Sequence, residues 1–190
     1  MGHMTEIDAG ELVLRPVGRE VALALLEGRV PAGVVLAPGY PSQFSLETMR
    51  LVVDADGDGD GFGPFFMVRK ADGAVVGEIG ASYHRATATA QVGYTVVEPS
   101  WGRGYATAAL RALLGHLLAD RRVRRVVAET LEEHTASRRV MEKAGMRYHD
   151  ARVGEVDGRT VPLVVYEAFP PTADRPRWRL GPRPGVTGLR

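Results

Sequence analysis

Hydrophobic and polar residues alternate along several short segments of the chain, and this alternation is typical of β-strands that bury one face. The segments that show it cover residues 11–17, 65–70, 74–83, 90–97, 125–131, 148–156 and 160–169. Two of the gaps between them, Ala71-Asp72-Gly73 and Asp157-Gly158, are turn sequences. We therefore expect two β-hairpins, one over 65–83 and the other over 148–169.

Other segments repeat their apolar residues at the spacing of an α-helix. They cover residues 19–29, 46–53 with Ser45 as the N-cap, 105–118 and 136–144, and residues 31–41 between the first two read as a loop. Hairpins come first along the chain, and strands alternating with helices come later. This order predicts an α/β fold in which a mixed, mainly antiparallel sheet carries helices on both faces.

The chain has 190 residues, which fits one domain with a proper core. Residues 1–4 (MGHM) look like a cloning scar, so we place the domain at 5–169. Residues 170–190 are rich in Pro, Arg and Gly and lack periodicity, so we expect a flexible tail.

Charge and composition exclude several classes of function. A formal net charge of +1 gives no general attraction to nucleic acid. The apolar runs are too short to span a bilayer. The chain contains no cysteine, which rules out disulfides, thiolate metal sites and cysteine nucleophiles, and we expect a cytoplasmic protein.

Residues 54–63 (DADGDGDGFG) resemble the opening of a calcium-binding loop. Such a loop needs a carboxylate at its twelfth position, but that position is Phe65. We interpret the segment as an acidic surface loop and expect no metal site in the protein.

The segment WGRGYATAAL at 101–110 places two glycines where a helix begins. Glycines let the backbone approach a ligand closely, and the first turn of a helix has unpaired N–H groups that bind phosphate. A mononucleotide P-loop would need Lys and Ser/Thr after the last glycine, where Tyr105 and Ala106 stand. A dinucleotide fingerprint would need a third glycine, which is missing.

A second segment, HTASRRVMEKAGM at 134–146, follows one strand and one loop later. Together with Gly93-Tyr94 in the preceding strand and the glycine turn, it resembles the GNAT superfamily of acyl-CoA-dependent N-acetyltransferases. The form of the turn is most similar to the branch that contains RimJ and RimL. The resemblance covers about residues 11–169 and is sharpest over about 92–148.

The resemblance implies a GNAT-like fold with splayed central strands and acetyl-CoA as the co-substrate. The glycine turn would bind the coenzyme diphosphate, and the strand before it would pair with the pantetheine arm. His134 stands where the family usually carries Asn. The implied coenzyme-binding residues are Tyr94, Thr95, Val96, Val97, Trp101, Gly102, Arg103, Gly104, Tyr105, Ala106, His134 and Ser137.

The implied chemistry is direct attack of a primary amine on the thioester, through a tetrahedral intermediate that a backbone N–H stabilises. Ser137 matches the family serine near the coenzyme sulfur, where it assists the departing thiolate. Many relatives carry a basic Glu where this sequence has Gln91, which cannot take a proton. Glu78 is our substitute candidate for the general base, with Glu129 and His84 as further candidates.

The acceptor amine would be a small molecule or a protein N-terminus, selected by residues 30–62 and the turn at Gly158. The acidic loop would favour a polycationic acceptor. Two other readings remain: a non-catalytic acyl-CoA-binding or regulatory module, for which Gln91 argues, and a nucleotide-binding protein. A homodimer through sheet edges or the C-terminal arm is compatible with the predicted fold.

Overall fold

A computed structural model describes residues 5–54, 61–156 and 158–171. In this part of the chain the strands form one sheet in the spatial order β1-β2-β4-β5-β6-β7-β9-β8, and β3 pairs with β5. The strands are β1 (Ile7–Ala9), β2 (Leu12–Pro16), β3 (Val35–Leu36), β4 (Phe65–Arg69), β5 (Ala74–His84), β6 (Thr89–Val96), β7 (Arg125–Leu131), β8 (Arg147–Val156) and β9 (Arg159–Ala168). The helices are α1 (Arg19–Leu26), α2 (Gln43–Asp54), α3 (Tyr105–Ala119) and α4 (Thr135–Ala144).

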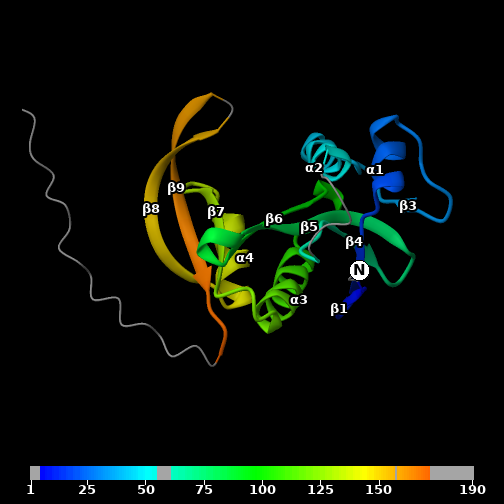
Figure 1. The fold of residues 1–190 in the computed structure, drawn as a ribbon. Coiled ribbons are helices and arrows are strands. Elements are labelled where there is room, and N and C mark those ends of the chain that lie inside the picture. The colour runs from blue at the N-terminus through cyan, green and yellow to red at the C-terminus, as the bar shows by residue number, and fades with distance from the viewer. Residues whose placement is uncertain (1–4, 55–60, 157, 172–190) are drawn as a thin grey trace, which may run out of the picture.

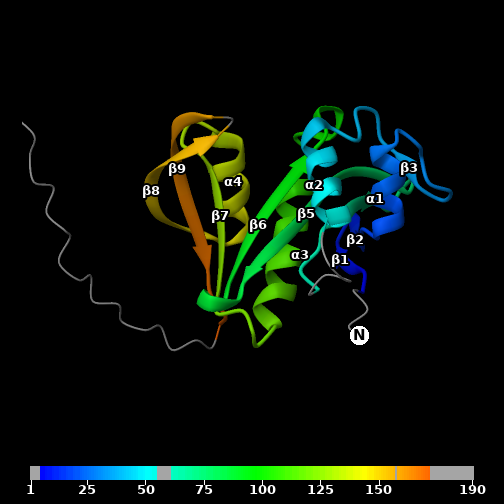
Figure 2. The same cartoon turned by 45° about the horizontal axis from the view of Figure 1, so that its top comes forward.

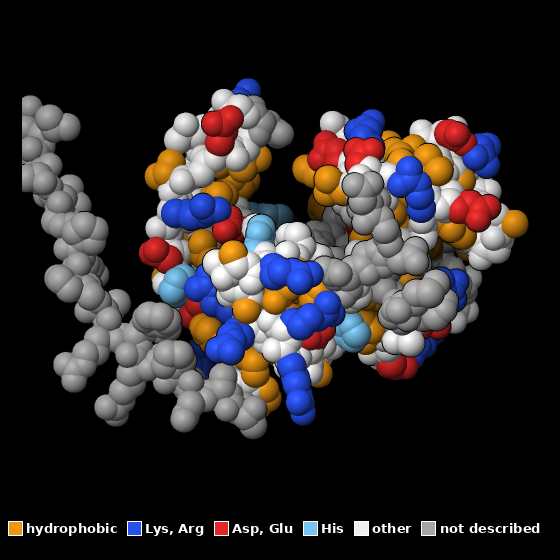
Figure 3. All heavy atoms as spheres, in the orientation of Figure 1, with side chains coloured by type: hydrophobic (Ala, Val, Ile, Leu, Met, Phe, Trp, Pro, Cys, Tyr) orange, Lys and Arg blue, Asp and Glu red, His pale blue; other side chains and the backbone are white. Residues whose placement is uncertain are grey.

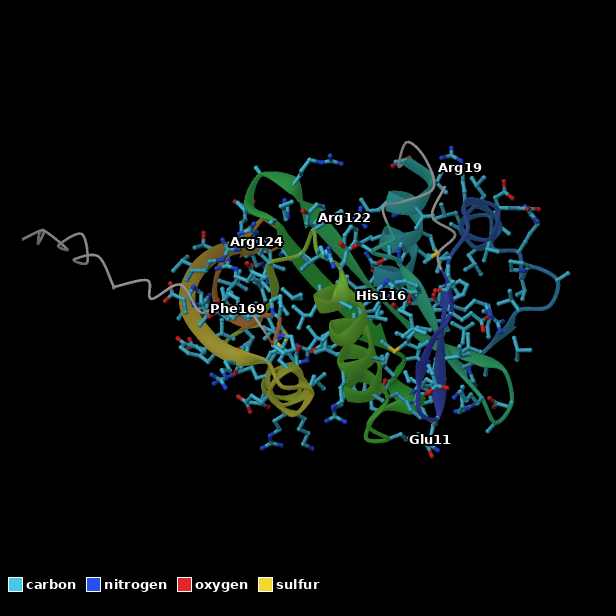
Figure 4. The ribbon with its side chains drawn as sticks, turned by 60° about the horizontal axis from the view of Figure 1, so that its bottom comes forward. Glu11, Arg19, His116, Arg122, Arg124 and Phe169 are labelled. Atoms are coloured by element: carbon cyan, nitrogen blue, oxygen red, sulfur yellow. The ribbon has the colours of Figure 1, made fainter. Side chains whose placement is uncertain are left out.

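The helices cover opposite faces of the sheet (Figure 1). Phe65 on β4 packs edge-on against His116 of α3, with the ring centroids 6.3 Å apart, and Figure 4 shows His116 on that helix. The next residue, Phe66, packs against Tyr40, which lies just before α2. Because neighbouring side chains on a strand point to opposite faces, α3 and α4 cover one face and α1 and α2 cover the other. The predicted mixed, mainly antiparallel α/β fold is confirmed.

The two central strands pair over only part of their length. β6 and β7 run parallel and are paired from Thr89↔Arg125 to Val92↔Ala128. Beyond that point they diverge, as Figure 2 shows. On its other side β6 stays paired with β5 as far as Gly77↔Val96. A Cβ atom at Gly77 would meet the Thr95 carbonyl oxygen at 2.1 Å, so this close approach requires glycine. The predicted splay of the central strands is therefore present.

The core lies between the sheet and the helices. On the sheet face that α3 and α4 cover, α3 contributes most of the buried apolar helix side chains. The side chains of Ala109, Leu110, Leu113 and Leu117 are almost fully buried. Their spacing is that of the apolar stripe in the sequence, and this burial fixes α3 against the sheet. No helix in the described ranges has the length and apolar character needed to cross a membrane.

The structure differs from the sequence-based expectations mainly in the N-terminal third. The prediction that Ser45 caps a helix starting at Leu46 is wrong, because α2 begins at Gln43. Ser42 is the capping residue: its Oγ accepts a hydrogen bond from Ser45 N at 3.2 Å, and Ser42 N donates to Ser45 Oγ at 3.1 Å. The short strands β1 and β3 were not expected. Residues 55–60 of the expected acidic loop at 54–63 and residues 172–190 of the expected tail at 170–190 lie outside the described residues.

Candidate functional site

The glycine turn lies immediately before α3 and has open backbone donors. Gly102 and Gly104 adopt φ of +75° and +79°, a left-handed conformation that favours glycine. A Cβ at either position would meet no atom within 4 Å. In the described part of the chain, none of the N–H groups of residues 102–107 has an acceptor, and the first helical bond in this region joins Ala108 N to Gly104 O. This corner can therefore bind an anion through backbone donors.

The end of β6 next to this turn has a backbone edge that does not pair with β7. Val97 N donates to Val76 O on β5 at 2.9 Å. Because backbone polar groups alternate in direction along a strand, the N–H and C=O groups of Tyr94 and Val96 face away from β5, into the space where β7 has diverged. Trp101, which is 64% exposed, donates its Nε1–H to Val96 O at 2.5 Å.

A hydrogen bond joins this strand to the beginning of α4. The hydroxyls of Tyr94 and Ser137 lie 2.9 Å apart, and Tyr94 also donates to the Ser137 carbonyl at 3.2 Å. Burial raises the pKa of Tyr94, and the hydrogen bond to Ser137 opposes that effect. His134, just before the helix, is exposed and lies 3.2 Å through Nδ1 from Thr130 Oγ1. The structure thus places Ser137 beside this edge of β6 and His134 at the rim.

Glu78 lies on β5 opposite Thr95 of β6, on the sheet face covered by α2. Only 3% of the residue is exposed, and neither carboxylate oxygen has a well-formed hydrogen bond among the described residues. Burial raises the pKa of Glu78 to about 7, and the nearby hydroxyls of Ser45 and Tyr40 offset this only in part. Burial, reinforced by the adjacent carboxylate, also raises the pKa of Tyr40 well above its usual range.

A cleft of about 510 Å³ opens on the same face as Glu78. Figure 3 shows it as a notch between the end with β8 and β9 and the end with α1 and α2. Its wall includes Phe44 of α2, Glu129 and Leu131 of β7, and Arg152 of β8. Arg152 and Glu129 form an ion pair. A pocket of this size accommodates a small organic molecule.

The structure brings most of the residues suggested by the sequence to the point where β6 and β7 diverge. The glycine turn, the end of β6 and Ser137 adjoin the α3–α4 face, while Glu78 and Glu129 lie on the opposite face. His84 is not part of this group, because it pairs with Thr89 at the other end of β6. Sequence analysis missed Arg152 and Phe44, since neither belongs to a recognisable motif.

Comparison with known proteins agrees with this fold. An acetyltransferase of the GNAT family from Bacillus anthracis superposes with a TM-score of 0.64 at 20% identity, covering 87% of this chain and 98% of that one. RimJ from Mycobacterium smegmatis, in complex with a CoA disulfide, gives a TM-score of 0.63 at 24% identity, covering 88% of each chain. RimL, an acetyltransferase of ribosomal protein L7/L12 in complex with coenzyme A, gives 0.65 at 19% identity, covering 87% and 98%.

No curated protein sequence gives a significant match. The sequence model of the acetyltransferase (GNAT) domain matches residues 11–147, which is more than half of the chain. The match includes the glycine turn and all of α4, so it contains both motifs that adjoin the divergence of β6 and β7. The chain therefore belongs to the GNAT family of acetyltransferases.

Proposed function

We propose that the protein transfers an acetyl group from acetyl-CoA to a primary amine of a small molecule or a protein N-terminus. The observation that carries this proposal is the arrangement around the diverging strands. Open backbone donors lie toward one face of the sheet, and a cleft with acidic side chains nearby lies on the other. The gap between β6 and β7 joins the two faces, so a thioester bound from one side is within reach of an amine from the other.

The residues at the glycine turn fit the diphosphate of a coenzyme. The N–H groups of residues 102–107 have no acceptor in the described structure, and the turn leaves open space where side chains would otherwise stand. RimJ and RimL, which have the same fold, were crystallised with forms of coenzyme A. When bound, acetyl-CoA supplies the acetyl thioester, and the Val96 N–H at the gap-facing edge of β6 can bind a carbonyl of its amide-bearing arm.

On the sheet face with Glu78, the acceptor amine loses a proton. A free alkylamine is largely protonated near neutral pH, so a base must remove a proton for the nitrogen to attack. Glu78 has a pKa of about 7 and lacks a well-formed hydrogen bond among the described residues, which suits it to this task. Glu78 does not line the cleft, so a water molecule must carry the proton to it. The nitrogen attacks the thioester carbonyl carbon to form a tetrahedral intermediate, which collapses to the amide as the C–S bond breaks.

On the opposite face, the leaving thiolate of the coenzyme gains a proton. Ser137 can donate its hydroxyl proton to sulfur, Tyr94, 2.9 Å away, can replace that proton, and water from solvent can then reprotonate Tyr94. The backbone N–H group of Tyr94 points into the gap, where it can stabilise the negative charge that develops on the carbonyl oxygen. Acid and base thus lie on opposite faces of the sheet, which keeps them from neutralising each other.

Two measurements on the purified protein test this function. Calorimetric titration measures the affinity for acetyl-CoA, and thiol detection measures coenzyme release over a panel of primary amines. We expect tight binding and amine-dependent thiol release. Binding without release for any amine would favour a non-catalytic acyl-CoA-binding module, and ATP competing better than coenzyme A would favour a nucleotide-binding protein.

A further inference from the structure

The wall of the cleft is apolar apart from one ion pair. Strand pairing places Leu131 of β7, Leu163 of β9 and Val156 of β8 on the sheet face that Glu129 and Arg152 also occupy. The exposed ring of Phe44 closes the side that α2 forms. Thr130 and Glu155 alternate with these positions, so their side chains leave toward the other face. Among the described lining residues, only Glu129 and Arg152 therefore present charged side chains to the cleft.

The ion pair lies next to the point where chemistry would occur. The last pair between β6 and β7 joins Val92 to Ala128, so Glu129 is the first residue of β7 beyond the divergence. Arg152 reaches it from β8 across the intervening strand β9. The Glu129 side chain is 20% exposed and that of Arg152 is 53% exposed, so both charges can contact a ligand in the cleft.

We propose that the acceptor is a small α-amino acid with an apolar side chain, an inference that rests on the proposed function. Its ammonium group binds Glu129, which places the nitrogen at the gap between β6 and β7. Its carboxylate binds Arg152, whose guanidinium matches a carboxylate in a two-point geometry. Its side chain lies against Leu131, Val156 and Phe44. The ligand's charges thus complement both members of the ion pair.

Other amine classes fit this wall less well. A polyamine would place a second cation in the cleft near Arg152, which costs energy through like-charge repulsion. The N-terminal residue of a peptide has an amide in place of the carboxylate, so Arg152 would lose its ionic partner in the ligand. The carboxylate next to the amine is therefore the feature that separates the proposed acceptor from its competitors.

A matched set of acceptors tests this proposal. Leucine, leucinamide, isopentylamine and spermidine differ in the group beside the amine or in charge. We expect the kcat/KM of leucine to exceed that of leucinamide and isopentylamine by about tenfold, the factor that a hydrogen bond to a charged group typically contributes. Equal values for leucine and leucinamide, or a preference for spermidine, would overturn the proposal.

Variants of the ion pair provide a second test of the proposed acceptor. Arg152→Gln should reduce the preference for leucine over leucinamide to near one, because it should lower the kcat/KM of leucine more than that of leucinamide or isopentylamine. Arg139→Gln, an exposed change on α4 that also removes one positive charge, should keep the preference. An equal loss for all acceptors in Arg152→Gln would contradict the assignment, and circular dichroism checks that each variant is folded.

Binding measured without turnover separates this proposal from the proposed function. Leucine is titrated into the protein saturated with coenzyme A, which lacks the acetyl group, and the binding is followed by NMR. Leucine should bind the wild type more tightly than Arg152→Gln by about tenfold or more. This result would support the acceptor site even if no amine released thiol, whereas thiol release with several amines and no effect of Arg152→Gln would refute the site alone.

Discussion

Replacement of Glu78 by Gln should change how stability depends on pH. Burial raises the pKa of this carboxyl from 4.5 to about 7 in the folded protein. Each unit of pKa difference between the folded and unfolded states corresponds to about 1.4 kcal/mol, so the shift corresponds to roughly 3 kcal/mol. The group is almost completely buried, so screening by solvent reduces this figure little.

The direction follows from where the proton is held. Between pH 4.5 and about 7 the unfolded chain releases the Glu78 proton while the folded protein keeps it. The unfolded state therefore binds fewer protons, and the free energy of unfolding falls as pH rises. The stability that the folded protein gains by keeping the Glu78 proton is fully present below the unfolded pKa of 4.5. It is lost above the folded pKa of about 7. Gln has no titrating proton, so the free energy of unfolding of Glu78→Gln should not fall in this way as pH rises.

Urea unfolding followed by far-ultraviolet circular dichroism measures the effect at about pH 5 and about pH 8. The wild type should lose about 2–3 kcal/mol more than Glu78→Gln between these two conditions. Glu47→Gln, an exposed change on the same side of the molecule in α2, should behave like the wild type. If the wild type and Glu78→Gln showed parallel pH profiles, the buried carboxyl would not hold its proton near neutrality, and the argument for Glu78 as the base would fail.

Three further predictions concern binding and turnover. Gly104→Val should weaken coenzyme A binding by about tenfold or more, because it fills the space beside the backbone donors. The control is Gly28→Val, because Gly28 has a similar φ and equally open surroundings. Each variant should cost about 1–2 kcal/mol of stability in urea unfolding, but Gly28→Val should keep the calorimetric affinity for coenzyme A. Equal affinities of the two variants for coenzyme A would refute the anion site. Ser137→Ala should lower kcat in the thiol assay by about 10²-fold and leave acetyl-CoA affinity unchanged, and an unaltered kcat would remove this residue from the mechanism. Turnover should rise as pH increases through about 7, and Glu78→Gln should flatten that rise and lower kcat by about 10²-fold.

Periodicity in the sequence was sufficient for most of the fold because burial is one-sided in most elements. The strand at 125–131 and the helix near 105–118 agree with β7 and α3 to within a residue or so. The errors lie where burial is not periodic. Val35–Leu36 in β3 is too short to show alternation, and Ile7–Ala9 in β1 has one buried residue. At α2 the buried apolar pattern starts after the helix does, because the first turn consists of Gln43, the exposed Phe44 and Ser45, which pairs with Ser42 before the helix.

The residues of the candidate site also fall into two groups, those that the sequence predicts and those that it does not. The glycine turn and Ser137 were predictable because each belongs to a local motif whose spacing is fixed by one helix. Glu78 could be suggested as a strand carboxylate, but its burial depends on Tyr40 and Ser45, which come from a loop and a helix far earlier in the chain. The pairing of Glu129 with Arg152 depends on the register of β8 and β9, and no residue near either position signals it.

The divergence of β6 from β7 also creates two exposed strand edges in the middle of the sheet. The backbone groups of Tyr94 and Val96 that face the gap have no β7 partner. Unpaired edges of this kind exchange their amide hydrogens readily and can pair with strands from other molecules. Occupancy by coenzyme should slow deuterium uptake at the amides of Tyr94 and Val96 and reduce aggregation on storage. The ligand would then serve as the missing strand that completes the sheet.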